Sequence, residues 1–413
     1  MITVLTNALI FDGTHADLKP GHVVIEDDRI VEVAAAAPSL QGEHTVVDVR
    51  GHTLMPGLID AHVHAHAPDV NYTLVDRMPM SLVAHWAHVV MRNWLRRGFT
   101  TVRDTGGGDQ GLCRAVSQGW LDGPRLIYCG PAFTQTGGGG DFRDPHDHDH
   151  VCLCACESYV GHGSRVIDGA DALRAAIREE FRRGASFIKI LASGAVAAPS
   201  NALDRAEFCD EEIAAMVDET GRYGSYVTAH VHPDAAARRC IELGVPFLEH
   251  ASLVSEETAT LAATRDVRVV PTLAVGWAFK QHGAEIGVPR NFLEKVARVQ
   301  EQIGQSVEYL KRAGVRTGFG TDCLGQLDKY QCMEFKLRSE IWSPAEILRQ
   351  ATSGNARILG LGGVGEVANG FKADLIVVDG NPLEDLGVFR PDGRDVRLVV
   401  KDGVIVKDDL DDM

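Results

Sequence analysis

Two histidines, His62 and His64, lie two positions apart at the end of an apolar run. The run Leu58–Val63 follows the turn residues Pro56 and Gly57, which predicts a buried strand. Side chains two positions apart on a strand point to the same face, so both imidazoles face one side. Neutral imidazole is a common ligand of divalent metals. The pair predicts part of a metal site, but in a chain with 17 histidines further ligands are needed to support it.

Four further apolar runs carry candidate ligands. Lys189 lies inside one run, and the other three end in His230 with His232, in His250 and in Asp322. An unpaired ammonium is costly to bury, so Lys189 needs a partner or an altered chemical state unless it reaches water at a strand edge. A single histidine at a strand end is more often a hydrogen-bonded structural residue than a ligand. Five strand ends that carry such residues support one shared site, provided that the strands end at the same place.

The middle of the chain alternates between strand patterns and helix patterns, as a barrel requires. Eight strands are predicted, at 58–64, 100–104, 125–129, 187–192, 226–232, 247–250, 268–273 and 315–321. Helical spacing of apolar residues is found at 170–183, 211–222, 235–243, 292–313 and 344–361. This alternation predicts an α/β fold with a (β/α)₈ TIM barrel, in which the strand ends share one mouth. An open doubly wound sheet is the alternative, but the glycine-rich stretches do not fit its Gly-x-Gly-x-x-Gly turn.

Short strand patterns without helices occupy both ends of the chain. We therefore expect residues 1–55 and 362–413 to form one small β-sandwich domain built from both chain ends. Residues 56–361 would then form the barrel.

Composition limits the classes of function. The chain has 413 residues, of which 45% are hydrophobic and 24% are charged, as in ordinary globular proteins. A net charge of −16 without a basic stripe argues against a nucleic-acid partner. No apolar run approaches the ~20 residues of a membrane helix, and the first residues have strand character without signal-peptide features. We expect no membrane partner and a cytoplasmic location.

Two neighbouring segments have unusual composition. Residues 136–141 include four consecutive glycines, and residues 141–150 are rich in Asp and His. We expect this loop to cover the barrel mouth as a substrate lid; a metal trap or a solvated loop are the alternatives. Cys152, Cys154 and Cys156 alternate but lack a Cys-x-x-Cys pair, so we expect ordinary thiols and no zinc role.

The set His62, His64, Lys189, His230, His250 and Asp322 resembles the metal ligands of the amidohydrolase superfamily. The resemblance covers nearly the whole chain, including the segment Met55–His64 and the closing segment Gly365–Val377. Segments Phe187–Gly194 and Gly138–Arg143 are most similar to the imidazolonepropionase-like branch. Within that branch they look closest to Xaa-Pro dipeptidases, with ochratoxin-type amidases nearby.

The resemblance implies a binuclear centre that holds two divalent ions. Zn²⁺ is the expected metal, and manganese or cobalt are the alternatives. Lys189 would be carboxylated to a carbamate that bridges both ions. His62, His64 and Asp322 would hold one ion, and His230 and His250 the other. The implied reaction is attack of a metal-bridging hydroxide on an amide carbonyl, with Asp322 transferring the proton to the leaving nitrogen. A homo-oligomer, such as an octamer, is also implied.

One position departs from the dipeptidase pattern, and it concerns the substrate pocket. A tyrosine commonly stands two residues after the ligand of the fifth strand, whereas this chain has His232. Its N–H group can stabilise an oxyanion or bind a substrate carboxylate, so we predict a catalytic and substrate-binding role. Arg143, His146 and Arg103 are further candidates for binding a substrate carboxylate.

The sequence therefore predicts a metal-dependent hydrolase of amide C–N bonds in small molecules. The expected substrate is a dipeptide (Xaa-Pro or related) or an N-acyl amino acid, including ochratoxin-like amides. A cyclic amide or carbamate hydrolase is the alternative within enzymes. A non-catalytic scaffold with this fold is the alternative from another class, but such proteins have lost ligands that are all present here.

Overall fold

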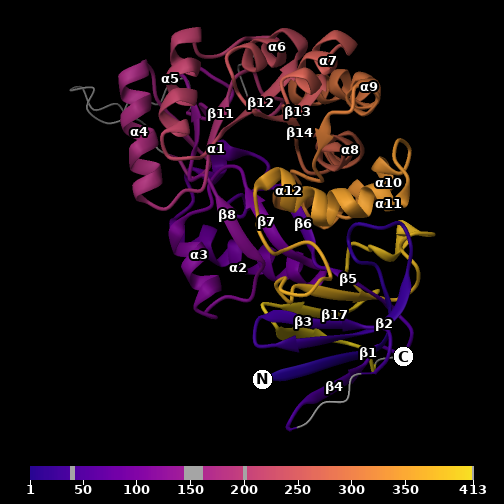
Figure 1. Cartoon of the computed structure of the whole chain (residues 1–413). Helices are drawn as coiled ribbons and strands as arrows, with labels where there is room; N and C mark the ends of the chain where they lie inside the picture. The colour runs from indigo at the N-terminus through magenta and orange to yellow at the C-terminus, as the bar shows by residue number, and fades with distance from the viewer. Residues whose placement is uncertain (38–41, 144–160, 199–201, 412–413) are drawn as a thin grey trace.

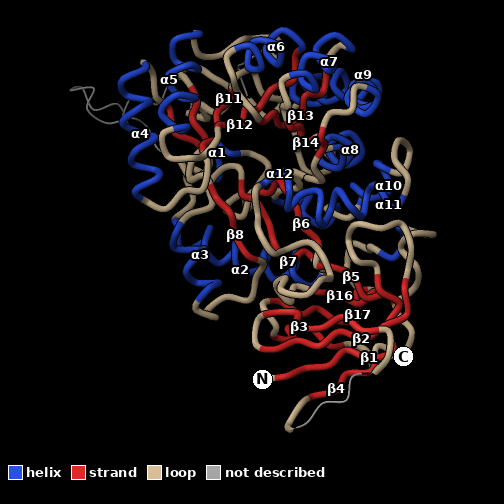
Figure 2. The backbone as a smooth tube through the Cα atoms, viewed as in Figure 1, coloured by secondary structure: helices blue, strands red, loops and turns tan. Residues whose placement is uncertain are grey.

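The computed structural model describes residues 1–37, 42–143, 161–198 and 202–411. Figures 1 and 2 show two parts: an upper part in which helices surround strands, and a lower part built mainly of strands. Both ends of the chain lie in the lower part, where the N-terminal indigo strands and the C-terminal yellow strands are neighbours (Figure 1). No helix among the described residues is long and apolar enough to cross a membrane.

The structure assigns eighteen strands within the described ranges. They are β1 (Ile2–Ile10), β2 (Lys19–Glu26), β3 (Arg29–Ala34), β4 (Thr45–Asp48), β5 (Thr53–Pro56), β6 (Leu58–Val63), β7 (Phe99–Asp104), β8 (Arg125–Tyr128), β9 (Ala132–Thr134), β10 (Ser164–Val166), β11 (Ile188–Leu191), β12 (Val227–Pro233), β13 (Phe247–Leu253), β14 (Arg268–Val270), β15 (Arg316–Thr317), β16 (Leu375–Val378), β17 (Val396–Lys401) and β18 (Val404–Asp408).

Helices mostly follow the strands of the upper part. The α-helices are α1 (Tyr72–Val75), α2 (Met80–Arg96), α3 (Gln110–Ser117), α4 (Ala170–Arg182), α5 (Asp210–Gly221), α6 (Asp234–Glu242), α7 (Glu256–Thr264), α8 (Leu273–His282), α9 (Arg290–Arg312), α10 (Met333–Arg338), α11 (Pro344–Arg349) and α12 (Asn355–Leu359). Three short helices of other types are η1 (Gly325–Tyr330), η2 (Gln350–Gly354) and η3 (Leu386–Val388).

Strands from both ends of the chain form one eight-stranded sheet, which we call the terminal sheet. Its order is β18-β17-β16-β5-β1-β2-β3, and β4 pairs with β1. The link between the two chain ends is the antiparallel pair β5–β16, in which Pro56 is opposite Leu375. Along β16, Ile376 and Val378 pack into the core shared with the upper part, while Leu375 and Val377 pack into a core on the other face. This alternation explains why β16 is apolar at every position.

The upper part contains two parallel sheets, β6-β7-β8 and β10-β9-β11-β12-β13-β14-β15. Backbone hydrogen bonds join them on one side, where Ala61 N–H donates to Phe319 O over 2.8 Å. On the other side Ser186 N–H donates to Tyr128 O, also over 2.8 Å. The arrangement is TIM-barrel-like, as predicted from the alternation of strands and helices.

Glycine is required where the terminal sheet leads into the first parallel strand. A Cβ atom at Gly57 would lie 2.1 Å from Oγ1 of Thr100, a separation that no side chain tolerates. The backbones of β6 and β7 can therefore approach closely here, and β6 is buried at all six positions. His62 lies six positions after Pro56, which ends β5, so the position of this histidine follows directly from the sheet.

The predicted elements agree with the structure except where segments are very short or change type within an apolar run. Each of the eight predicted strands overlaps a strand of the structure. The one predicted at 268–273 ends at Val270, and helix α8 begins at Leu273; the one predicted at 315–321 is reduced to Arg316–Thr317. The short strands β9 and β10, and the helices α1, α2, α3, α7, α8 and α10, were not predicted. The predicted helix at 344–361 is divided into α11, η2 and α12.

Candidate metal centre

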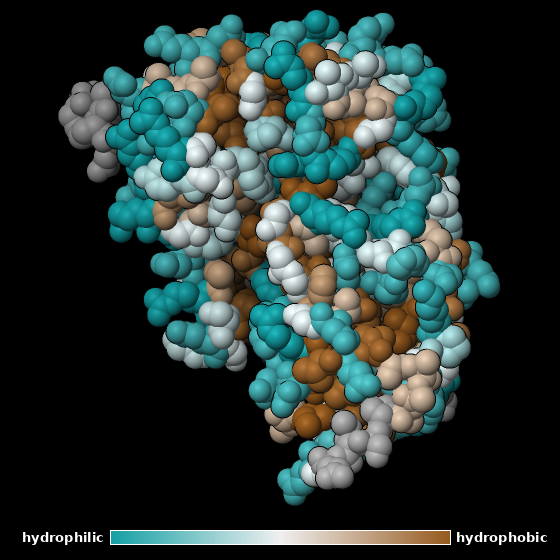
Figure 3. All heavy atoms as spheres, in the orientation of Figure 1, coloured by the Kyte–Doolittle hydropathy of each residue, from teal (hydrophilic) through white to brown (hydrophobic). Residues whose placement is uncertain are grey.

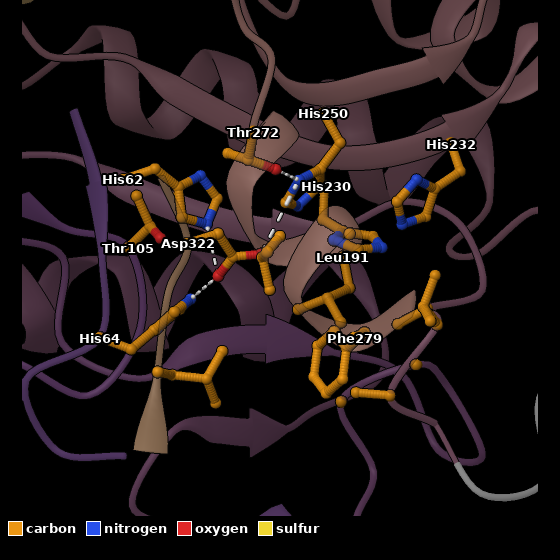
Figure 4. Close-up of a pocket in the computed structure, with 18 of the residues that line it drawn as sticks. His62, His64, Thr105, Leu191, His230, His232, His250, Thr272, Phe279 and Asp322 are labelled. Atoms are coloured by element: carbon orange, nitrogen blue, oxygen red, sulfur yellow. Dashed lines mark hydrogen bonds and ion pairs between the residues drawn. The ribbon is translucent and has the colours of Figure 1, made fainter. Parts of the chain in front are cut away.

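One cavity is bordered by all six predicted metal ligands, and they come from five strands or their ends. His62 and His64 come from the end of β6, Lys189 from β11, His230 from β12, His250 from β13, and Asp322 from the segment after β15. Figure 4 shows the carboxylate of Asp322 directed between His62 and His64, with His230 and His250 on its other side. Residues distant in sequence therefore meet because parallel strands end together.

The closest group of possible ligands consists of His62, His64 and Asp322, whose ligand atoms lie within 4.8 Å of one another. Oδ1 of Asp322 is 3.5 Å from Nε2 of His62 and 3.1 Å from Nε2 of His64. Burial raises the pKa of the Asp322 carboxyl, but the neighbouring His62 and the hydrogen bond from His64 lower it below its ordinary value. A negative oxygen beside two imidazole nitrogens is a donor set that suits a divalent ion.

A second group lies beside the first and consists of His230, His250 and Lys189. The ring centroids of His230 and His250 are 4.6 Å apart, and His62 is 4.9 Å from His250. Nε2 of His230 is buried without a hydrogen-bond partner among the described residues. Burial lowers the pKa of both histidines well below the ordinary value, so both are neutral. Buried polar atoms are normally paired, so an unpartnered nitrogen on a neutral ring is available as a ligand of a divalent ion.

The ammonium of Lys189 is the least expected group at this position. The residue is 3% exposed, and burial lowers the pKa of its amino group. Within the described part of the chain, no hydrogen bond or ion pair involves its Nζ atom. A lysine of this kind needs a change of chemical state to be stable in the cavity, in line with the expectation from the sequence.

Three of the histidines are held in place by hydrogen bonds at their Nδ1 atoms, so that the Nε2 atom of each ring is the one available to a metal ion. Nδ1 of His62 is 2.7 Å from Oε2 of Glu249, Nδ1 of His64 is 3.0 Å from the carbonyl oxygen of Gly106, and Nδ1 of His250 is 2.7 Å from Oγ1 of Thr272. Such partners fix the tautomer and the ring orientation of metal-binding histidines. Neither Glu249 nor Thr272 was identified from the sequence.

Glu249 is the centre of a fully buried network under His62. Its carboxylate accepts hydrogen bonds from Nη2 of Arg103 and Oγ1 of Thr228, each over 2.5 Å, besides the contact with His62. Burial raises the pKa of Glu249, but the charge of Arg103 and the contact with His62 lower it by more than burial raises it. The pKa lies below its ordinary value, so the carboxylate is ionised. The guanidinium of Arg103 also lies over the ring of Phe247, 4.5 Å from its centroid. The only sequence signal for this network is an acid inside a buried strand.

A second buried carboxylate ties the first strand to the segment that carries Asp322. Asp60 accepts hydrogen bonds from Thr321 Oγ1 over 2.7 Å and from Nε2 of Gln331 over 3.0 Å. Burial raises its pKa to about 6.

His250 and Asp322 have φ angles of 66° and 55°, in the left-handed region. Non-glycine residues in this region store strain of about 1–3 kcal/mol each, and such residues cluster at functional sites.

His232 also borders the cavity, on the side of His230. The centroids of these two rings are 4.7 Å apart, and Nδ1 of His232 is 3.1 Å from Oγ of Ser252. Burial lowers the pKa of His232 to about 4, against the opposing charge of Asp322. The ring is neutral at pH 7 and can donate one N–H group.

The other residues named from the sequence lie away from the cavity or outside the described part. Arg143 pairs with Asp141, with Nη2 2.6 Å from Oδ2, and is not among the described lining residues. Arg103 is buried under the site and bonds to Glu249. His66, which was left out of the predicted ligand set, has its Nδ1 2.8 Å from the carbonyl oxygen of Gly107. His146, the three cysteines at 152, 154 and 156, and the loop from residue 144 onward lie outside the described residues.

Comparison with known proteins agrees with the resemblance noted from the sequence. The chain is 41% identical, with a TM-score of 0.94, to a prolidase solved as a complex with N-methylphosphonate-L-proline, and the match covers 99% of this chain and 100% of that one. It is 28% identical, with a TM-score of 0.84, to a Xaa-Pro dipeptidase with bound methionine in the active site, over 98% and 100% of the two chains. It is 29% identical to ochratoxinase from Aspergillus niger, over 98% of this chain and 87% of that protein. The sequence pattern of the amidohydrolase family matches residues 53–406, and the chain belongs to this family.

Proposed function

We propose that the chain hydrolyses an amide C–N bond with two divalent metal ions, in a dipeptide of the Xaa-Pro type or in an N-acyl amino acid. The observation that carries the proposal is the convergence of four histidines, one carboxylate and one buried lysine on a single cavity. The similarity to a prolidase, a Xaa-Pro dipeptidase and ochratoxinase supports the choice of amides as substrates.

The donor set supports one ion held by His62, His64 and Asp322, and a second held by His230 and His250. A carbamate formed from Lys189 and carbon dioxide would supply the shared anion, which accounts for a buried lysine that forms no hydrogen bond or ion pair within the described residues. Imidazole and carboxylate donors favour Zn²⁺, with manganese or cobalt as alternatives. When bound, the two ions would lower the pKa of a water molecule to roughly 7 and polarise the substrate carbonyl.

The chain's own side chains would orient the substrate and move the proton. Asp322, with its carboxylate ionised and directed into the cavity, would accept a proton from the attacking water and deliver it to the leaving nitrogen. Neutral His232 would donate its free N–H to the developing oxyanion or to a substrate carboxylate. Glu249 would hold His62 in place throughout.

The same proposal assigns a role to each part of the chain. Residues 56–361 would form the catalytic (β/α)₈ barrel, and residues 1–55 with 362–413 would form the β-sandwich domain that packs against it. The active form would be a homo-oligomer.

Metal analysis and a substrate screen test the proposal together. The chain is expected to bind about two ions and to cleave members of a dipeptide and N-acyl amino acid library. A chain that binds no metal after reconstitution would be a scaffold instead of an enzyme. Lys189→Ala is expected to lose metal and turnover together, whereas Asp322→Asn is expected to keep some metal and lose most turnover. A Lys189→Ala variant with full metal content and turnover would remove the bridging role.

A further inference from the structure

Away from the histidines, the cavity is bordered by apolar side chains of α8, α9 and two loops. They include Val70, Phe142, Val275, Phe279, Val296 and Ile303, and each is at most 9% exposed. Figure 4 shows Phe279 and Leu191 directly beside the histidine cluster, so the apolar wall begins next to the candidate metal centre. The space open to the centre of a water molecule is about 150 Å³. An apolar group attached to a substrate held at the metal centre would be enclosed there.

Within the described residues, charged side chains border this cavity only at its metal end. Among the described lining residues, the Asp, Glu, Lys and Arg side chains are Lys189 and Asp322 alone, and both belong to the candidate metal centre. A charged substrate side chain that entered the apolar end would lose its hydration without meeting a counter-charge, which is costly. An uncharged side chain would instead gain from the removal of apolar surface from water.

The amide of Gln300 is a polar group within the apolar wall, in a lining that also includes the hydroxyl groups of Tyr72, Thr105 and Ser164. Its Nε2 atom is buried and has no hydrogen-bond partner within the described residues. The amide lies against α8 at Gly276, where an added Cβ atom would be only 2.2 Å from Nε2 of Gln300. Buried amides are normally paired, so an unpaired amide at the edge of a substrate cavity is available to a ligand oxygen.

We propose, on the basis of the function proposed above, that the substrates are amides with a bulky, uncharged, apolar side chain. This side chain would fill the end of the cavity formed by Phe279, Val296 and their neighbours. The amide of Gln300 would donate a hydrogen bond to a carbonyl or carboxylate oxygen of the same substrate. Gln300 is thus a specificity-determining residue, separate from the metal ligands.

Two matched substrate series test the preference. Xaa-Pro dipeptides and N-acetyl amino acids, each with Leu, Phe, Asp or Lys at the variable position, are assayed with the metal-loaded enzyme. In the series that is cleaved, kcat/KM is expected to be at least tenfold higher for Leu and Phe than for Asp and Lys. Similar values, or a preference for a charged member, would overturn the proposal even though the enzyme is an amidase.

Binding distinguishes failure of this inference from failure of the proposed function. The same compounds are added to the metal-loaded protein and Tm is measured. If nothing is cleaved but the Leu and Phe compounds alone raise Tm, the amidase assignment fails and the apolar specificity stands. If nothing is cleaved and the four side chains shift Tm equally or not at all, both fail.

Gln300→Met tests the polar contact, since methionine has a similar length and cannot donate. The expected result is a KM about fivefold higher for the Leu substrate with an unchanged kcat, because one hydrogen bond to the bound substrate is lost. Tm is expected to stay equal or rise, because no protein partner of this amide is lost. Gln302→Met, at an exposed position on the same helix, is the control and should change neither value. An unchanged KM, or a Tm lowered by several degrees, would remove Gln300 from substrate binding.

Discussion

Glu249→Gln should destabilise the protein strongly, although it changes one atom of one side chain. Glu249 and Arg103 are both 0% exposed, and their contact is a buried ion pair. The variant leaves the guanidinium without its counter-charge, and removing one partner of a buried pair costs about 3–5 kcal/mol. The glutamine amide would also place an NH₂ group opposite donors from which the carboxylate accepts hydrogen bonds, and this adds to the loss of stability. The metal affinity is expected to fall by about 10- to 100-fold, as is usual when the partner of a ligating histidine is removed.

Urea unfolding in the presence of a chelator measures the first effect without any contribution from metal. Asp204→Asn is the control, because its pair with Arg298 is exposed at 58% and 48% of the two side chains, and such pairs contribute at most about 1 kcal/mol. Competition with a chromophoric chelator measures the second effect. The double variant Arg103→Met, Glu249→Met should recover stability but not metal affinity. A loss below about 1 kcal/mol for Glu249→Gln, similar to the control, would refute the role of this pair.

Three other predictions concern acid stability, thiol reactivity and packing. Partial burial raises the pKa of Asp12, but hydrogen bonds from the following turn lower it to about 2. The carboxylate therefore stabilises the fold at pH values above its ordinary pKa, and this contribution is lost as the pH falls towards 2. Asp12→Asn should cost about 1 kcal/mol at pH 7 after allowance for solvent exposure. In urea titrations this cost should stay constant down to about pH 5 and shrink only as the pH falls below the ordinary pKa of an aspartate; an equal cost at pH 7 and pH 3.5 would count against it. At pH 8 iodoacetamide should label exposed Cys209 well before Cys240, whose pKa burial raises to about 12; equal labelling in peptide mapping would contradict this. Gly320→Ala should lower the metal content measured by elemental analysis, because its Cβ atom would lie 2.9 Å from Cβ of His62; full occupancy would show that the site adjusts.

The strands of the barrel could be predicted because each is an apolar run between turn residues, and their alternation with helices is regular. The run around Val270 and Leu273 could not be divided correctly, since a short apolar run has no period that separates a strand from a helix start. Strands β9 and β10 contain three residues each, which is too short for any pattern. The amidohydrolase resemblance could be recognised because its motifs are spread along the chain, and the family match over residues 53–406 confirms it.

For the site, the sequence indicated residue types at strand ends, and the structure brings those six residues to one cavity. The residues that hold the ligands could not be predicted. Glu249 reaches His62 across the barrel, and Arg103 reaches Glu249 from another strand, so these contacts depend on strand register and tilt. Gln300 has an ordinary position on an amphipathic helix and differs only by its missing partner. Arg143 has a local partner in Asp141, which a sequence cannot distinguish from a free loop arginine.

The pairing of β5 with β16 also affects how the chain is made on the ribosome. Pro56 is opposite Leu375 in the terminal sheet. One edge of β5 therefore has no partner until about 320 further residues have been synthesised. At about 5–20 residues per second this interval is roughly 15–60 s. During that time the apolar edge of β5 can pair with other nascent chains, as unpaired sheet edges tend to do. The first parallel strand, β6, waits almost as long for its second neighbour, since Ala61 N–H bonds to Phe319 O. We therefore expect the nascent chain to expose both edges, and to bind chaperones there, until its last part has been synthesised.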